Sequence, residues 1–225
     1  MNILYLDKYI TVCEKPIGTL SEGEGQAALP TILSKELSAR GEDNLTVIPV
    51  HRLDKDTTGV IVYARTSAAA AALSSSIANG SFKKQYLAVL CGTPTEESGT
   101  LTDLLFYDRK RNKSFVADRK RNGVKSASLD YCLLDTSGDY SLVSVNLHTG
   151  RTHQIRVQFA SRGLPLAGDR RYGAPKSDAP SIALCAHRLT FPHPKNGALL
   201  SFTADVPRTF PWIFFDKALD NHIKR

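Results

Sequence analysis

The sequence has no apolar run that could cross a membrane and no start typical of an exported protein. Among its 225 residues no stretch of about eighteen uncharged apolar residues occurs, which excludes a transmembrane helix. The first ten residues, MNILYLDKYI, place Asp7 and Lys8 where a signal peptide needs an unbroken apolar segment. We therefore expect a cytoplasmic protein without a membrane partner.

Paired cysteine and histidine motifs are absent as well. The four cysteines lie far apart without a Cys-x-x-Cys pair, which argues against a disulfide framework and against a structural zinc site. None of the six histidines has the spacing that places two imidazoles on one face of a helix. The Gly-x-Gly-x-x-Gly and P-loop patterns are also missing, so these motifs indicate neither a metal nor a nucleotide cofactor.

Positive charge is what the sequence has in excess. Lysine and arginine number 29 against 22 acidic residues, which gives a net charge of +7 and a pI near 9.3. The excess gathers in residues 108–125, where DRKRN occurs at 108–112 and again at 118–122. Such a segment suits contacts with RNA phosphates, and it equally suits a solvated hairpin whose charges only keep it soluble. Charge alone favours neither reading of the four candidate residues, Arg109, Arg111, Arg119 and Arg121.

The apolar pattern predicts more strands than helices, and several strands follow one another directly. Helices are expected over residues 29–41, 67–80 (with Ser67 as the N-cap) and 151–163. Strands are expected over 3–14 (as two short strands), 45–50, 58–64, 82–92 and, as a hairpin, 126–148. The missing crossover helices argue against a doubly wound parallel sheet. The sequence therefore predicts one α+β domain over residues 1–225 with a mixed, mainly antiparallel sheet.

The stretch HRLDKDTTGV, residues 51–60, places two acids between a cationic pair and a turn. Asp54 could cap the turn, hold a metal for phosphoryl chemistry, or act as a lone catalytic carboxylate in a nucleic-acid site. Asp54 and Asp56 fit the D-x-D-x-T pattern of haloacid-dehalogenase-like phosphatases, in which carboxylates bind magnesium. That pattern normally ends a buried strand and needs a late acidic pair, but Pro49 precedes this stretch and two cations follow Asp169. The phosphatase is therefore the weaker alternative.

Several blocks together resemble the RluA-type pseudouridine synthases. Residues 51–54 and 57–59 resemble the family motif H-R-L-D-x-x-T-S-G, with Thr58 where the family usually has serine. The other blocks stand in the family's order: KPIG (15–18), KKQYLAVLCG (83–92), LHTGRTHQIRVQ (147–158), GLPLAGDRRYG (163–173) and CAHRLTFPHP (185–194). The resemblance covers Ile3 to about Ala204, and the chain is expected to lack the N-terminal S4-like domain of many relatives.

The resemblance implies an enzyme that breaks the N-glycosidic bond of a uridine in RNA, turns the base and rejoins it through C5. It assigns the catalytic carboxylate to Asp54, acting as a nucleophile or as a base towards the ribose. Arg156 would pair with Asp54 and keep it ionised, and Tyr86 would stack on the uracil or assist removal of the C5 proton. Arg52 would fill the space of the flipped nucleotide, while Asp56 would only shape the turn.

The resemblance also implies the surroundings of the reaction. The expected fold is the pseudouridine synthase fold, a mainly antiparallel sheet flanked by helices and loops, with a central catalytic cleft. The reaction needs neither cofactor nor metal, and the partner is structured RNA, tRNA or rRNA, with no obligate protein partner. An RNA-binding module without activity is a second alternative, which the intact catalytic set argues against. Further residues expected at the substrate are His51, mainly as support of the turn, Thr58, Arg151 and Gln154.

Overall fold

The computed structural model describes residues 1–223, and the chain divides into two compact units. Unit 1 consists of Met1–Lys84 and Ala186–Asp205, and unit 2 of Gln85–Cys185 and Val206–Arg225. No helix in the described part of the chain is long and apolar enough to span a membrane. The α+β class predicted from the sequence is confirmed in both units, since each contains helices and mainly antiparallel strands.

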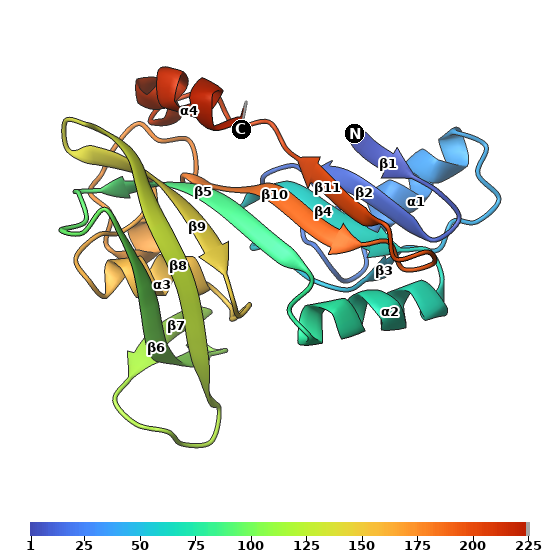
Figure 1. Ribbon diagram of the computed structural model, residues 1–225, viewed down its shortest axis with the longest axis horizontal. Helices are drawn as coiled ribbons and strands as arrows, with labels where there is room; N and C mark the ends of the chain where they lie inside the picture. The colour runs from blue at the N-terminus through green and yellow to red at the C-terminus, as the bar shows by residue number, and fades with distance from the viewer. Residues whose placement is uncertain (224–225) are drawn as a thin grey trace. The chain divides into compact units, whose positions relative to one another are not determined.

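Unit 1 is built on a sheet in which β1, β2, β4 and β10 lie in this order (Figure 1). Strand β3 pairs with β4, and β11 pairs with β10. The strands are β1 (Ile3–Leu6), β2 (Ile10–Lys15), β3 (Ile48–Pro49), β4 (Thr58–Ala64), β10 (Leu184–Pro192) and β11 (Leu199–Thr203). The helices are α1 (Leu29–Ala39) and α2 (Ser67–Ala78).

The core of unit 1 forms between the central strands and α2. Val60 and Val62 of β4 are buried together with Ile10 and Val12 of β2, and Leu73 of α2 packs against the same cluster. The predicted helix and strands over 67–80, 58–64 and 3–14 are confirmed, whereas only Ile48–Pro49 of the strand expected over 45–50 pairs. The predicted N-cap was wrong by one residue: the Thr66 hydroxyl, not Ser67, accepts the N–H of Ala69 at 3.1 Å, because Thr66 keeps an extended backbone.

Unit 2 is built on five antiparallel strands in the order β5, β9, β8, β6, β7. These are β5 (Lys83–Cys91), β6 (Ser98–Asp108), β7 (Lys113–Ala117), β8 (Val124–Ser137) and β9 (Tyr140–Leu147). The helices are α3 (Gln154–Ala160) and α4 (Asp216–Ile223), with 3₁₀ turns η1 (Arg170–Tyr172) and η2 (Trp212–Phe215). Leu87, Val89 and Leu142 form its main apolar cluster with residues of η2 and α4.

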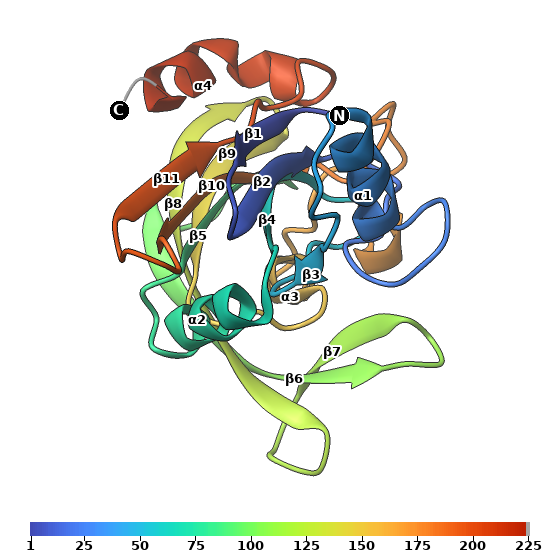
Figure 2. The ribbon, with the colours of Figure 1, turned by 90° about the vertical axis from the view of Figure 1, so that its right-hand side faces the viewer.

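The hairpin predicted over 126–148 is confirmed as β8 and β9, while the helix predicted over 151–163 is shorter. His153 has φ +53°, in the left-handed region, so α3 begins only at Gln154. The sequence did not predict α4. Figure 2 shows β6, β7 and the start of β8 extending beyond α3 within unit 2.

Gly59, at the start of β4, has a backbone that other residues rarely adopt, with φ at +124°. A Cβ atom on this residue would lie 2.3 Å from the carbonyl oxygen of Ala186 in β10. Two strands of unit 1 therefore approach each other here only because the side chain is a hydrogen.

Replacing Gly59 with alanine is expected to lower the free energy of unfolding by more than the roughly 1–3 kcal/mol of backbone strain alone. Gly80→Ala is the matched control, because Gly80 also has a positive φ, +76°, but nothing lies within 4 Å of its Cβ position. Urea unfolding of both variants measures the difference. Equal losses of stability would show that the contact with Ala186 contributes nothing.

Candidate active site

The loop that carries Asp54 in unit 1 is fixed on its N-terminal side by Ser21. The Ser21 hydroxyl accepts the N–H of Leu53 at 2.9 Å and donates to the carbonyl of the same residue at 2.8 Å. Tyr63 of β4 donates its hydroxyl to the Ser21 carbonyl at 2.8 Å. Leu53 is buried, and the N–H of Thr57 closes a turn onto the carbonyl of Asp54 at 3.1 Å. Asp54 is thus the half-buried first residue of a turn with an anchored backbone.

A buried lysine fixes the other side of this loop. Lys15, at the end of β2, is fully buried and donates from Nζ to the carbonyls of Lys55 and Pro16, both at 3.0 Å. The Thr58 hydroxyl donates to the carbonyl of Lys15 at 2.9 Å. Burial lowers the pKa of the Lys15 ammonium to about 8, an effect that the negative charges of Asp56 and Asp54 partly oppose. The KPIG block therefore anchors the Asp54 loop through the hydrogen bonds of Lys15.

Arg52 and His51 point to different surroundings, although they are adjacent in the chain. The Arg52 side chain is 58% exposed and forms an ion pair with Glu22. Exposed pairs of this kind contribute about 1 kcal/mol or less, so Arg52 is held only loosely. His51 instead packs its ring edge-on against Phe82 at 5.2 Å, and its Nε2 accepts the N–H of Val62.

The imidazole of His51 is neutral in the folded protein. Burial, together with the nearby charge of Lys84, lowers the pKa of His51 to about 3. Its Nδ1 is buried and has no hydrogen-bond partner among the described residues. His51 therefore supports the loop from the interior of unit 1, and its predicted contact with RNA stays a prediction.

In unit 2, Arg156 of α3 is held by a carboxylate in a bidentate pair. Its Nε lies 2.6 Å from Oδ2 of Asp169, and its Nη2 lies 2.9 Å from Oδ1. The two side chains are only 4% and 1% exposed. The guanidinium also lies over the ring of Tyr172, with Cζ 5.1 Å from the centroid. Two parallel hydrogen bonds and a ring contact leave the guanidinium one orientation.

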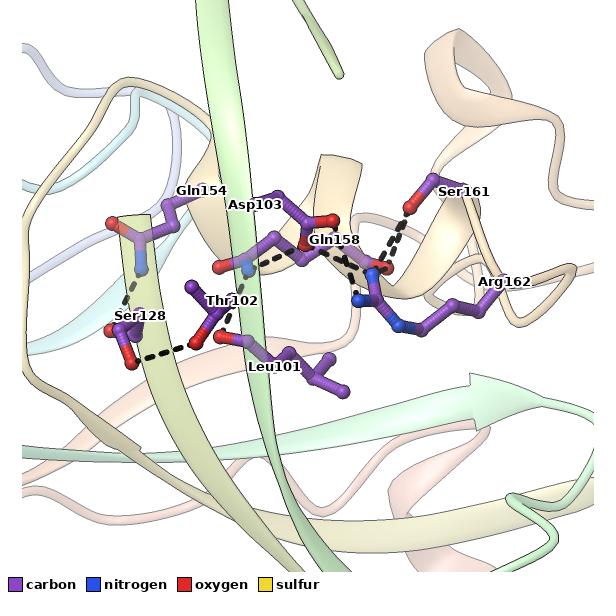
Figure 3. Close-up of polar contacts among 8 residues, drawn as sticks. All are labelled: Leu101, Thr102, Asp103, Ser128, Gln154, Gln158, Ser161 and Arg162. Atoms are coloured by element: carbon purple, nitrogen blue, oxygen red, sulfur yellow. Dashed lines mark hydrogen bonds and ion pairs between the residues drawn. The ribbon is translucent and has the colours of Figure 1, made fainter. Parts of the chain in front are cut away.

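Two glutamines tie α3 to the neighbouring strands. The side-chain oxygen of Gln154 accepts from the Thr149 hydroxyl at 2.8 Å and from the N–H of Arg151 at 3.0 Å. Its Nε2 donates to the carbonyl of Ser128 in β8 at 3.1 Å (Figure 3). Gln154 is buried, so the described contacts place it in the support of α3. Its predicted contact with RNA stays a prediction.

The second glutamine, Gln158, lies one turn further along α3. Its Nε2 donates to the carbonyl of Leu101 at 3.1 Å and to Asp103 at 2.7 Å, both in β6 (Figure 3). Arg162 pairs with the same carboxylate of Asp103 at 2.9 Å. Gln154 and Gln158 therefore fix α3 against β8 and β6.

Tyr86 and Arg151 lie elsewhere in unit 2. Tyr86 is a buried residue of β5, opposite Val145 of β9. Arg151 precedes α3 and donates from Nε to the carbonyl of Ser126 at 2.9 Å. The catalytic residues expected from the sequence thus come from both units, Asp54 from unit 1 and Tyr86 and Arg156 from unit 2.

The basic segment 108–125 forms the turn between β6 and β7, strand β7, and the connection to β8. Arg171 of η1 donates to the carbonyl of Asn112 at 2.6 Å, and Lys113 donates back to the carbonyl of Arg171 at 2.7 Å. These bonds fix the first turn to η1. The four arginines predicted to contact RNA are all exposed: Arg109, Arg111, Arg119 and Arg121.

The sequence of this chain matches a known protein family over most of its length. A model described as RNA pseudouridylate synthase matches residues 9–161, which include the Asp54 loop, Tyr86 and Arg156. The chain belongs to the RNA pseudouridine synthase family. This synthase is therefore an enzyme that isomerises uridine in RNA, and the phosphatase alternative falls away.

Individual relatives agree with the family match. The synthase is 33% identical to an uncharacterized RNA pseudouridine synthase of Bacillus subtilis, YlyB, covering 92% of this chain and 69% of the relative. It is also 33% identical to the ribosomal large subunit pseudouridine synthase D of Xanthomonas campestris, covering 92% and 66%. The structure of human RNA Pseudouridylate Synthase Domain Containing 4 has a TM-score of 0.77 at 24% identity, covering 97% of this chain and 92% of that one. This last likeness confirms the predicted fold.

Three residues that hold the Asp54 loop or Arg156 were not singled out from the sequence of the synthase, namely Lys15, Ser21 and Tyr172, and a fourth, Asp169, was considered only as a possible metal ligand. Lys15, Asp169 and Tyr172 lie inside blocks that match the family, KPIG and GLPLAGDRRYG. These blocks predicted that both segments belong to the family's catalytic domain, but they did not predict which of their side chains would be buried. Ser21 lies in a polar loop and left no signal in the sequence.

The neutral His51 predicts how the stability of the synthase depends on pH. Its pKa is about 3 in the folded protein and about 6.5 in an unfolded chain, so the unfolded state binds more protons between these values. The stability that neutral His51 contributes is complete above pH 6.5 and is lost as pH falls towards 3. The stability advantage of wild type over His51→Gln should therefore shrink by up to about 1.4 kcal/mol per pH unit. Urea unfolding at pH 7, 6, 5 and 4 measures it, and a constant difference contradicts the assignment.

Proposed function

We propose that this chain converts specific uridines of structured RNA into pseudouridine, with Asp54 as the catalytic carboxylate. The observation that carries the proposal is the position of Asp54, in a turn anchored by Ser21 and Lys15 and inside the segment that matches the family. A carboxylate whose backbone is fixed can meet the ribose in one geometry. Asp54 acts there as a nucleophile or as a base while the N-glycosidic bond breaks and C5 is joined to the ribose.

Arg156 is proposed to keep Asp54 ionised. Asp169 uses Nε and one N–H of Nη2, whereas a guanidinium carries five N–H groups. A guanidinium can therefore bind a second carboxylate as well as Asp169. The two units of the chain would then contribute to one catalytic domain, as expected for residues 1–225.

Tyr86 is proposed to contact the flipped uracil, and Arg52 is proposed to fill the gap that the uracil leaves in the base stack. The target atoms lie within a base stack, so the nucleotide has to be flipped out at a cost of about a few kcal/mol. Arg52 is exposed and weakly held, which suits a planar cation that enters the stack in place of the base. Tyr86 would lie against the flipped uracil, where its ring can stack and its hydroxyl can assist removal of the C5 proton.

The substrate is proposed to be tRNA or rRNA in the cytoplasm. Relatives named ribosomal large subunit pseudouridine synthase D in three bacteria favour large-subunit rRNA as the first RNA to test. Total RNA from a strain that lacks this gene contains the target uridines unmodified, and a map of pseudouridines in both strains identifies the position.

Asp54→Asn is expected to abolish turnover, whereas Asp56→Asn is expected to largely spare it. Asp56 is exposed and is proposed only to shape the turn, so it is the matched control two residues away. RNA from the deletion strain, labelled with tritium at uridine C5, reports the reaction by release of tritium in the presence of a chelator. Equal loss in both variants would mean that the loop works as a pair of acids, and absence of release by the wild type would overturn the synthase proposal.

The exposed arginines of segment 108–125 are proposed to contact the RNA backbone. Replacing Arg109, Arg111, Arg119 and Arg121 with glutamine removes up to four phosphate contacts, so both the RNA affinity and its dependence on salt should fall. Filter binding between about 50 and 200 mM salt measures the slope. The control for net charge replaces four exposed lysines outside this segment with glutamine, Lys8, Lys35, Lys176 and Lys195. An unchanged slope in the fourfold variant shows that the segment is only a solvated surface.

A further inference from the structure

The carboxylate of Asp169, which binds Arg156 in unit 2, has no role in the proposed chemistry. Asp169 is 1% exposed, and both of its oxygens bind the guanidinium of Arg156. An ion pair this deeply buried contributes little net stability, because removing two charges from water offsets most of their attraction. Its effect is on geometry, since a bidentate pair fixes both the plane and the direction of the guanidinium.

The backbone around Asp169 is built to place it. Gly168 has φ +78°, and a Cβ there would lie 2.2 Å from the carbonyl of Ser181. The N–H groups of Tyr172 and Ala174 donate to the carbonyl of Asp169 at 3.0 and 3.1 Å, which starts η1. In a 3₁₀ turn the residues i and i+3 lie above one another. The spacing Asp169-x-x-Tyr172 therefore brings the carboxylate and the ring to the same guanidinium.

Tyr172 is in turn fixed through its hydroxyl. The oxygen accepts the N–H of Ser114 in β7 at 2.7 Å and lies 3.0 Å from Nδ1 of His153, the residue before α3. Burial raises the pKa of Tyr172 to about 12, so the hydroxyl stays protonated. The ring under Arg156 is thus tied both to the sheet and to the start of α3.

We infer that Asp169 is a positioning residue for the isomerisation, acting through Arg156, with the Tyr172 ring as the floor on which the guanidinium lies. The inference rests on the proposed function, in which Arg156 keeps the catalytic carboxylate ionised. Asp169 fixes the plane and the direction of the Arg156 guanidinium, and it does not contact the uridine itself. Its loss should therefore lower kcat without weakening the binding of RNA.

The test compares Asp169→Asn with Asp103→Asn. Both residues pair with an arginine of the same region, but Asp103 binds Arg162 and Gln158 and does not contact Arg156. With tritium release as the assay, Asp169→Asn should lower kcat by roughly 100-fold, the effect of a misplacement of about 1 Å. The KM for RNA should stay within about twofold. Asp103→Asn should lower the melting temperature and retain kcat per folded molecule.

The background of Arg156→Gln separates positioning from a merely structural role. If Asp169 acts through Arg156, then adding Asp169→Asn to Arg156→Gln causes no further loss of kcat. A structural role instead gives the same factor in both backgrounds and follows the folded fraction measured by circular dichroism. If Asp169→Asn does not fold, Asp169→Glu replaces it, since this variant keeps the charge and shifts the guanidinium. A wild-type kcat in the variant that folds overturns the inference.

A second readout does not need activity. In nitrogen-15 spectra of the wild type, the Nε–H of Arg156 should give a slowly exchanging signal because it is buried and bonded to Asp169. The signal should disappear in Asp169→Asn and remain in Asp103→Asn. An unchanged signal in Asp169→Asn overturns the inference even if no RNA is turned over. Failure of the proposed function is recognised separately, by a wild type that releases no tritium while this signal behaves as expected.

Discussion

A guanidinium that is buried needs a carboxylate, and the local structure around α3 follows from how this demand is met. Arg156 is on a helix of seven residues in which Gln154 to Phe159 are all buried, and its own side chain is only 4% exposed. Removing one partner of such a pair costs about 3–5 kcal/mol, because the other charge is left unpaired in the interior. The Gly168 backbone, the η1 turn and the Tyr172 ring all serve to bring one carboxylate to this cation. A helix too short to be stable alone thus acquires a fixed position through its polar side chains.

Unit 1 anchors the loop of its own charged residue, Asp54, through the backbone of the neighbouring residues. The carbonyls of Leu53 and Lys55 are bound by Ser21 and Lys15, so the backbone on both sides of Asp54 is anchored. The negative charges of Asp56 and Asp54 attract the ammonium group of Lys15 and partly oppose the effect of burial on the pKa of this lysine. His51, three residues before Asp54 in the chain, is neutral and adds no positive charge to the loop.

The sequence predicted the elements that depend on local pattern. The two short strands before Lys15 were confirmed, because the Asp7 carboxylate accepts the N–H groups of Tyr9 and Ile10 and forms the predicted turn between them. The extent of α3 was not predicted, because it depends on the left-handed backbone of His153, which no pattern of apolar residues reveals. The family blocks located the Asp54 loop and Arg156, but periodicity says nothing about which acid meets an arginine 13 residues before it in the chain. The carboxylate of Asp169 was instead weighed as a metal ligand.

The two arginines proposed to take part in the reaction differ in their exposure, as their proposed tasks require. Arg52 keeps 58% of its side chain exposed and Arg156 only 4%. A residue that replaces a flipped base has to move into the stack, so a weak surface pair with Glu22 is an advantage, because it costs little to break. A residue that holds a catalytic carboxylate must not move, because a misplacement of about 1 Å is enough to lose most of the rate. In the proposed mechanism, the same guanidinium group therefore fills the gap of the flipped base where it is hydrated, at Arg52, and holds a carboxylate in place where it is buried against Asp169 and Tyr172, at Arg156.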